Sequence, residues 1–162
     1  MSQIDCFLKI DGIEGESQDA QHKGEIEVQS WSFSESQSTS SNSGGGAGAG
    51  KVTLQPCQFN LQTSKASPRL FLAGASGQRF KTATLTCRRS GQKAQDFLKI
   101  TLSDVLVASF GTSGASSDQL PIDQMSLSYR AISYEFTPQK ADGSPDTSLK
   151  MGWDMKTNKA SD

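Results

Sequence analysis

The sequence predicts an all-β domain, mainly antiparallel, that closes into a barrel and carries one short helix on its flank. Seven or more segments alternate apolar and polar residues with the period of a strand, and only one segment has the signals of a helix. The formal charge is −1 at pH 7, so exposed sheet edges would have little like-charge protection against association. Closure removes such edges and therefore favours a barrel over an antiparallel sandwich. The 162 residues fit a single domain, residues 1–162.

The first two strand patterns differ in regularity. In "CFLKI", the side chains of Cys6, Leu8 and Ile10 share one face, as expected for a strand with one face in the core. The run "EIEVQSWSF" begins with apolar residues at even positions and then places Trp31 and Phe33 at odd positions. Such a change of parity is typical of a β-bulge, which inserts one residue and re-aims the side chains. The alternative is a strand covered on both faces, by the core and by another chain.

Five further runs complete the set of strands. "KVTLQPCQF" changes parity around Pro56, which suits a bulge or an edge strand better than a regular central strand. "MSLSYRAISYEF" changes parity as well, whereas "LKMGWDM" alternates cleanly. The other two runs are "TATLTC", rich in β-branched residues, and a long pattern from Phe97 to Phe110.

The helix is predicted in "SPRLFLAGASG". Ser67 is expected as N-cap and Pro68 as the first helical residue, with Gly74 or Gly77 as the stop. Two or three turns are marginal alone, so packing through Leu70, Phe71 and Leu72 is expected to hold the helix, Ser67–Ala75.

A segment of seventeen residues, Ser34 to Gly50, has almost nothing to bury. Loops longer than about 12–15 residues are uncommon in compact domains and are usually functional or disordered. Such a Ser/Gly-rich loop orders at little cost against a neighbouring molecule, or it is a flexible linker without a role. A second Gly/Ser-rich segment, Gly111–Asp118, leaves the same two possibilities open.

The sequence offers little for catalysis, cofactors or metals. His22 is the only histidine, so no histidine cluster for a metal exists and a Ser–His–Asp set would have one possible base. "GGGAGAGK" lacks the ending of a phosphate-binding loop, because Lys51 is followed by Val52 and a strand pattern. We therefore expect no enzyme activity, no cofactor and no catalytic or metal-binding residue.

The remaining reactive or charged side chains have ordinary structural interpretations. The cysteines, Cys6, Cys57 and Cys87, form no metal-binding pattern and are expected to be buried reduced thiols. Acidic residues in the first turn are expected to be solvated and not to bind Ca²⁺; they are Asp11, Glu14 and Glu16. "CRRSGQK" is expected to be a hairpin turn whose Arg88, Arg89 and Lys93 cover its end with charge or form the rim of a protein interface.

Charge and hydropathy restrict partners and location. A net charge of −1 argues against a nucleic acid or an anionic membrane as main partner. The start "MSQIDCFLKIDG" alternates like a strand and does not resemble a signal peptide, and no apolar run is long enough to insert into a membrane. The sequence therefore predicts a protein that begins in the cytoplasm.

Six fragments resemble one known family. "DCFLKIDGIEGES", "HKGEIEVQSWSFS", "SPRLFLAGASGQ", "FLKITLSDVLVASF", "YEFTPQKADGS" and "GWDMKTN" occur in the order and spacing of the haemolysin-coregulated protein (Hcp) family. The similarity covers Ile4 to Lys159. That family forms the tube of the bacterial type VI secretion system.

The resemblance implies a fold, an assembly and a set of partners. Two antiparallel sheets would close into the barrel, and six copies would form a ring with a wide channel. Rings would stack into a tube inside a contractile sheath, built on a baseplate and capped by a VgrG-type spike protein. Contraction would expel the tube, so the protein would be cytoplasmic before firing and extracellular afterwards. Small effector proteins would bind in the ring lumen, which makes the ring their chaperone.

Two groups of residues are expected to carry this function. If Trp31 and Phe33 enter the core, Ser30 and Ser32 alternate outward and are expected to face the lumen and its cargo; plain solvent exposure is the alternative. The long loop is expected to reach a neighbouring ring and become ordered there. Its ring-stacking residues would be Gln37, Ser38, Ser40, Asn42, Gly44, Gly45, Gly46 and Gly48.

Two other functions compete with the tube subunit. One is a secreted Hcp-family variant that acts as an effector or surface-binding protein; we expect no toxin domain, since the sequence ends at Asp162. The other is a small-ligand barrel or hydrolase, which would need a convergent polar site with a usable base. His22 alone does not supply such a site.

Overall fold

The computed structural model describes residues 4–38, 51–91, 94–117 and 119–161. Within these ranges the chain forms eleven strands and one helix. In chain order they are β1 (Ile4–Ile10), β2 (Ile26–Ser32), β3 (Glu35–Gln37), β4 (Val52–Leu54), β5 (Cys57–Gln62), α1 (Ser67–Ser76), β6 (Arg79–Arg89), β7 (Gln95–Ser113), β8 (Ile122–Ser128), β9 (Ala131–Phe136), β10 (Leu149–Asp154) and β11 (Lys159–Ser161). Every pairing between these strands is antiparallel.

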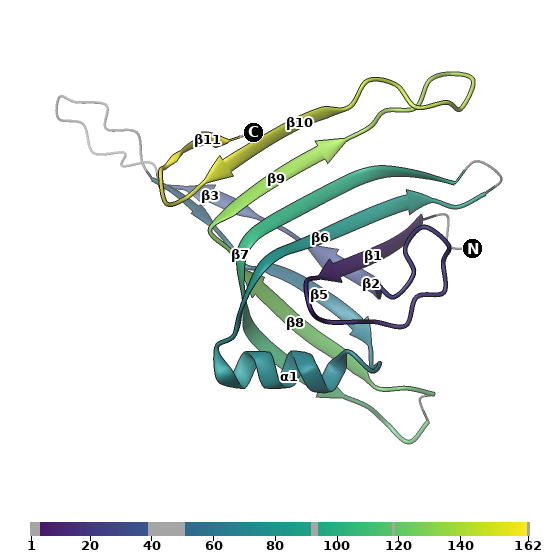
Figure 1. The fold of residues 1–162 in the computed structure, drawn as a ribbon, viewed down its shortest axis with the longest axis vertical. Coiled ribbons are helices and arrows are strands. Elements are labelled where there is room, and N and C mark those ends of the chain that lie inside the picture. Colours follow the sequence, from purple (N-terminus) through teal and green to yellow (C-terminus); the bar gives the residue numbers. More distant parts are fainter. Residues whose placement is uncertain (1–3, 39–50, 92–93, 118, 162) are drawn as a thin grey trace.

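Six strands close into a barrel, as predicted (Figure 1). Their order is β6-β1-β2-β5-β8-β7, and the pairing of β7 with both β8 and β6 completes the ring. Apolar side chains of these strands form one core; among the fully buried ones are Leu8, Ile26, Phe59, Leu85 and Leu127. The all-β fold class with one flanking helix is therefore confirmed.

Strand β7 belongs to two parts of the sheet. It is 19 residues long; residues 98–103 pair with β9, and residues 106–113 pair with β8. Between these segments Asp104 has φ 54°, a left-handed conformation that Asp adopts more readily than most residues. Strands β9, β10 and β11 continue the sheet past the barrel, at the top of Figure 1, and we call these three strands the extension.

The bulge predicted in "EIEVQSWSF" is confirmed. In the pairing of β2 with β5, Val28 lies opposite Leu61 and Ser30 lies opposite Asn60, so Gln29 is the extra residue on β2. The inserted residue changes the parity of the strand, and the apolar positions after it therefore differ in parity from those before it.

The run "KVTLQPCQF" is divided into two strands. β4 ends at Leu54 and β5 begins at Cys57, with Pro56 between them, because proline has no N–H to donate to a ladder. β4 pairs instead with β3 in a separate two-stranded sheet. Segment 34–50, expected to be a loop, thus contains strand β3, while residues 39–50 lie outside the described ranges.

The run "MSLSYRAISYEF" is also two strands. β8 ends before Tyr129, and β9 begins after Arg130. Both strands run antiparallel to β7, one after the other, so a two-residue break at Tyr129 and Arg130 accompanies the change of parity in this run. The predicted hairpin in "CRRSGQK" is confirmed, because β6 and β7 pair on either side of it.

The predicted helix is α1, which ends one residue later than expected. Gly77 has φ 71°, and its N–H donates to the Ala73 carbonyl at 3.0 Å. This left-handed C-terminal residue is a position that favours glycine, so Gly77 is the stop and Gly74 lies within the helix.

The start and the packing of α1 differ from the prediction. Ala66, not Ser67, is the N-cap residue, and no side chain caps the helix. The Ser67 hydroxyl donates to the buried carboxylate of Asp123 instead. Of the three apolar residues expected to pack, Leu70 is buried, but Phe71 and Leu72 are each 61% exposed, because a short helix on a sheet buries only one stripe.

Candidate functional site

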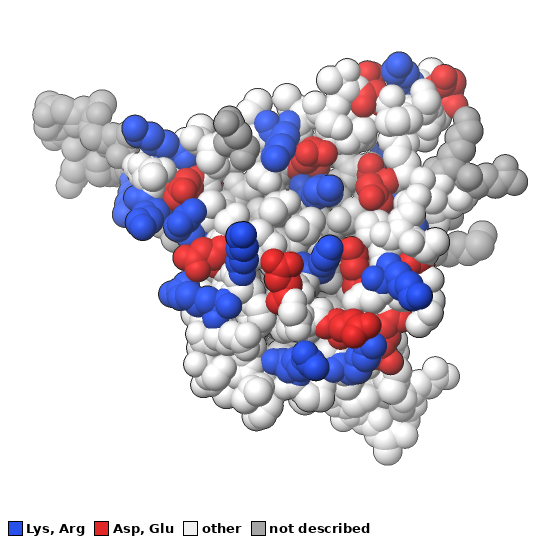
Figure 2. Space-filling model, viewed as in Figure 1, with Lys and Arg blue, Asp and Glu red and all other residues white. Residues whose placement is uncertain are grey.

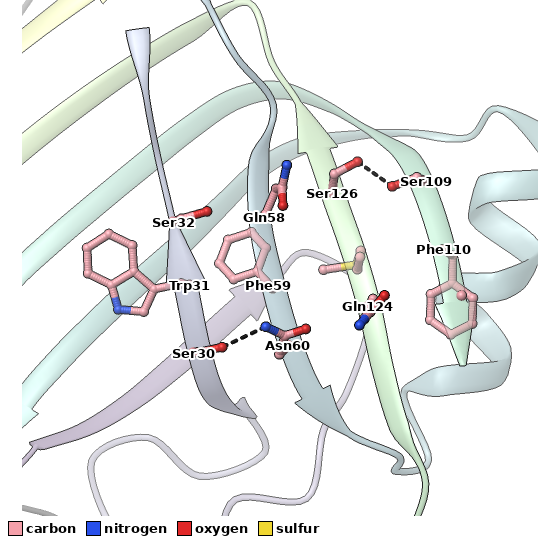
Figure 3. Close-up of a pocket in the computed structure, with 12 residues that line it drawn as sticks. Ser30, Trp31, Ser32, Gln58, Phe59, Asn60, Ser109, Phe110, Gln124 and Ser126 are labelled. Atoms are coloured by element: carbon pink, nitrogen blue, oxygen red, sulfur yellow. Dashed lines mark hydrogen bonds between the residues drawn. The ribbon is translucent and has the colours of Figure 1, made fainter. Parts of the chain in front are cut away.

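One outward face of the barrel carries polar but uncharged side chains (Figure 3). They come from β2, β5, β8 and β7 and line an open cavity of about 610 Å³. We call them the neutral face; its members are Ser30, Ser32, Gln58, Asn60, Ser109, Gln124 and Ser126.

The first row of the neutral face crosses four strands. Ser32 lies opposite Gln58, and Gln58 lies opposite Ser126. Ser126 in turn lies opposite Ser109, and their hydroxyl groups are 2.5 Å apart in a hydrogen bond. Cross-strand contacts of this kind stabilise a sheet while leaving polar atoms at its surface.

The second row runs parallel to the first. Ser30 lies opposite Asn60, Asn60 opposite Gln124, and Gln124 opposite Gly111. The side-chain amide of Asn60 donates to the Ser30 hydroxyl at 2.7 Å. Gly111 leaves the end of this row without a side chain, which widens the cavity.

Apolar side chains form the other side of the same strands. Phe59 and Met125 are buried in the core, with Trp31 and Phe110 partly buried at the two ends of their row. Strand β7 reaches this register through a second bulge, after Val107. The two bulges therefore bring hydroxyl groups of β2 and β7 to the same face.

The neutral face can form hydrogen bonds with a bound polypeptide whatever the charge of that polypeptide. None of the described residues that line its cavity is charged. Serine hydroxyls donate or accept as required, and amide side chains do both. The arrangement suits contact with varied polypeptide surfaces, whereas it offers no general base for a reaction.

Sequence reasoning found part of the neutral face. Ser30 and Ser32 are exposed, as their alternation with Trp31 predicted. It missed the members on β5, β8 and β7. A signal existed in "VLVASF", where the apolar residues change from odd to even positions before Phe110, as they do in the bulged strand β2.

Only two of the predicted ring-stacking residues lie in the described ranges. Gln37 is the last residue of β3, and Ser38 follows it at the surface. The others lie outside the described residues; they are Ser40, Asn42, Gly44, Gly45, Gly46 and Gly48.

Arg88 is buried, contrary to the expectation that it covers the hairpin end with charge. It is 8% exposed, and its guanidinium lies 2.5 Å from the Asp19 carboxylate and 5.2 Å from the centre of the Phe7 ring. Hydrogen bonding to Arg88 lowers the pKa of Asp19 to about 2. Arg89 lies over the Phe97 ring at 4.5 Å, and Lys93 is outside the described residues.

His22 is part of the same buried network. Its ring stacks on Phe7 with 4.5 Å between centroids, Nδ1 lies 2.7 Å from Glu25, and Nε2 lies 3.1 Å from Asp96. Both ring nitrogens are thus engaged by carboxylates. These contacts fix the loop before β2 to the end of the β6–β7 hairpin, which is a structural role.

The face of the molecule seen in Figure 1 differs from the neutral face in its charge. Figure 2 shows acidic and basic side chains interspersed on the face seen in Figure 1, where β1 and β6 are in front and β2, β5 and β8 lie behind. Interspersed charges make a well-solvated surface and no single-sign patch.

Comparison with known proteins decides the family. Residues 7–136 match the family described as "Type VI secretion system effector, Hcp". The chain belongs to the Hcp family. It is 43% identical to Protein hcp1 of Pseudomonas aeruginosa over 157 residues, which are 96% of this chain and 97% of that one.

Solved structures of Hcp proteins agree in fold. Hcp1 from Salmonella typhimurium is 34% identical with a TM-score of 0.83, and the match covers 99% of this chain and 100% of that chain. A further type six secretion system protein has a TM-score of 0.91 at 27% identity, with 98% and 99% coverage. Hcp proteins are secreted structural proteins of type VI secretion, not enzymes.

The described residues form neither a metal centre nor a membrane-spanning helix. Across residues 4–38, 51–91, 94–117 and 119–161, no group of three or more His, Cys, Asp or Glu side chains is placed to hold a metal ion. The same part of this Hcp chain has no helix with the length and apolar character needed to cross a membrane.

Proposed function

We propose that this Hcp chain is the subunit of a hexameric ring, and that such rings stack into the inner tube of a type VI secretion system. The observation that carries the proposal is an exposed apolar face on the extension. A chain of this family with such a face needs further copies to cover it.

The apolar face consists of two rows that leave the core. Leu98 lies opposite Phe136, which lies opposite Leu149; the last two are 39% and 63% exposed. In the second row Tyr134 and Met151 are opposite one another and are 45% and 65% exposed.

The opposite side of the same strands is charged. The row between the two apolar rows runs from Lys99 to Glu135 to Lys150, which alternate in sign across the sheet. One side of the extension therefore suits water and the other suits a second copy. Its contact with a different patch of the next subunit is heterologous, which closes into a ring when the rotation is cyclic.

The neutral face would line the ring lumen. Small neutral side chains allow effector proteins of different charge to pass or bind, and Ser30 and Ser32 would lie at the contact.

The two-stranded sheet of β3 and β4, together with segment 39–50, would reach the next ring. The sheath, the VgrG-type spike and the baseplate would be the outer partners, and sheath contraction would move the protein from the cytoplasm to the outside of the cell.

The mass of the purified protein in solution tests the ring. Light scattering should give about 104 kDa, six times the 17.3 kDa of one chain. Met151→Asp should lower the mass to that of one chain, because the substitution places a charge on the apolar face. Lys150→Gln, on the adjacent residue but the opposite side of the strand, should leave the ring intact. A wild-type monomer at every concentration would refute the proposal.

A further inference from the structure

Two cysteines that are far apart in sequence lie opposite one another in the barrel. Cys6 of β1 and Cys87 of β6 are directly paired in register, at a sequence separation of 81 residues. Their sulfur atoms are 2.9 Å apart in a thiol–thiol hydrogen bond. Both are free thiols in this structure.

This arrangement permits a disulfide without movement of the strands. Directly opposed residues of an antiparallel pair have Cα atoms about 4.5–5.5 Å apart. Disulfides form at Cα separations of about 4.4–6.8 Å. Since the side chains already point at one another, bond formation needs the sulfurs to approach by only about 0.9 Å further.

The two thiols differ in reactivity. Cys6 is partly exposed, whereas Cys87 is buried at 1% exposure. The hydrogen bond from Cys87 lowers the pKa of Cys6, and the same bond raises the pKa of Cys87. Cys6 is therefore the thiolate that meets a reagent first. Cys57 is fully buried, and burial raises its pKa to about 11, so it stays unreactive.

We propose that Cys6 and Cys87 form a dithiol site that a low-molecular-weight disulfide converts into a cross-strand protein disulfide. The Cys6 thiolate attacks one sulfur of the small disulfide and forms a mixed disulfide, and one small thiolate leaves. The Cys87 sulfur then attacks the Cys6 sulfur and releases the second small thiol. Two electrons pass from the protein sulfurs to the small disulfide, and the two cysteine protons end on the two small thiols.

The site would respond to the compartment of the protein. The reducing cytosol keeps both thiols reduced, and an oxidising exterior favours the disulfide. This consequence rests on the proposed function, because it assumes that the protein leaves the cytoplasm. The disulfide joins the two neighbouring barrel strands and would stabilise the exported form.

Oxidised glutathione is the probe that tests the site. The purified wild-type protein is incubated with it, treated with a thiol-alkylating reagent under native conditions and digested with trypsin. We expect a disulfide between the tryptic peptides that end at Lys9 and Arg88, with Cys57 alkylated only after denaturation. The melting temperature should rise by roughly 5–10 °C and return on addition of a reductant.

A variant separates the two steps. Cys87→Ser should stop the reaction at one glutathionyl group on Cys6, with no linked peptides. For the wild-type protein, a stable glutathionyl group on Cys6 or free alkylation of both cysteines would overturn the proposal. The readout is independent of ring formation: a monomer that closes the disulfide would refute only the ring, and a ring that does not close it would refute only the dithiol site.

Discussion

At the scale of the residue, a charged side chain can be buried when residues distant in the sequence provide its partners. Arg88 is the clearest case, since its guanidinium bonds to Asp19 and covers the ring of Phe7. The pair holds the loop before β2 against β6. Removing the acid would leave a buried cation without its closest partner, which costs more than an exposed ion pair contributes.

The bond between Asp19 and Arg88 predicts a pH dependence of stability. Arg88 lowers the pKa of the Asp19 carboxyl from 3.8 to about 2, so the folded state favours the ionised form. This contribution is fully present above pH 3.8 and is lost as the pH falls through about 2. Asp19→Asn should melt at a lower temperature than wild type at pH 7, and the difference should shrink between these two pH values. Thermal melts across that range measure it.

A nearby exposed carboxylate gives the matched control. Glu27→Gln, on an outward position of β2, should shift the melting temperature little at any pH. A difference between wild type and Asp19→Asn that stays constant down to pH 2 would contradict the assignment.

A substitution at Ser32 should weaken the binding of effector proteins without changing ring assembly. Ser32→Gln adds bulk to the neutral face and not to the core, so ring mass should be unchanged. A loss of about 1 kcal/mol in contact free energy would lower effector affinity about five-fold. The amount of small effector protein recovered with purified rings measures the change, and Ser76→Gln at the exposed end of α1 is the control. Unchanged recovery would remove Ser32 from the cargo contact.

Sequence patterns predicted apolar positions better than charged ones. Leu8 and Ile10 are buried as their alternation indicated, because burial of apolar groups needs no particular partner. Arg88 was expected at a charged hairpin end, and no sequence pattern predicted that His22 is buried. Their burial depends on Asp19 and Asp96, and nothing local in the sequence identifies those partners.

Among the elements, α1 is attached to the barrel by a buried polar contact. Asp123 of β8 is fully buried and accepts hydrogen bonds from Thr63, at 2.8 Å, and from Ser67. The helix has no side-chain cap of its own, so this contact fixes where it begins.

Asp123→Ala should destabilise the protein by about 3 kcal/mol, because the buried Ser67 hydroxyl and the partly buried Thr63 hydroxyl lose their acceptor. Ser67→Ala removes one donor and should cost about 1 kcal/mol. Gln124→Ala, on the next residue and the neutral face, should stay within about 0.5 kcal/mol of wild type. Denaturant unfolding measures all three; equal effects of Asp123→Ala and Gln124→Ala would contradict the attachment.

Local pattern was enough for the bulge in β2 but not for the helix cap. The bulge leaves a change of parity around Gln29 that is visible in the sequence. The capping prediction failed because a serine before a proline is a good N-cap only if no stronger partner is near. Asp123, brought in by β8, is such a partner for Ser67.

At the scale of the whole molecule, closure was predictable and strand order was not. Low net charge and many short strand patterns favoured a barrel, which β7 and β8 complete. The buried positions of β7 change parity at Asp104, from Leu102 to Val105, but nothing in this local pattern identifies a change of partner strand from β9 to β8. The extension, with its apolar face, follows from that change.

Deletion of residues 37–48 tests the axial contact between rings. The deletion leaves the barrel and the extension intact, so six-membered rings of the shortened chain should still form. Stacking of these rings into tubes should be abolished, since the segment proposed to reach the next ring is gone. Electron microscopy of concentrated protein measures this against the full-length chain. Loss of the rings themselves, or tubes that persist, would contradict the proposed role.

The length of β7 bears on how the proposed tube would carry mechanical load. One continuous strand, β7, pairs with β6 from Gln95 to Leu106 and with β8 from Leu106 to Ser113, so it joins the barrel wall to the extension. A force along β7 therefore acts on many peptide hydrogen bonds at once, in shear, and does not open them one by one. A force applied to the extension is transmitted to the barrel through β7, without a loop between the two parts. A stack of such chains would therefore resist compression along its axis as a stiff rod.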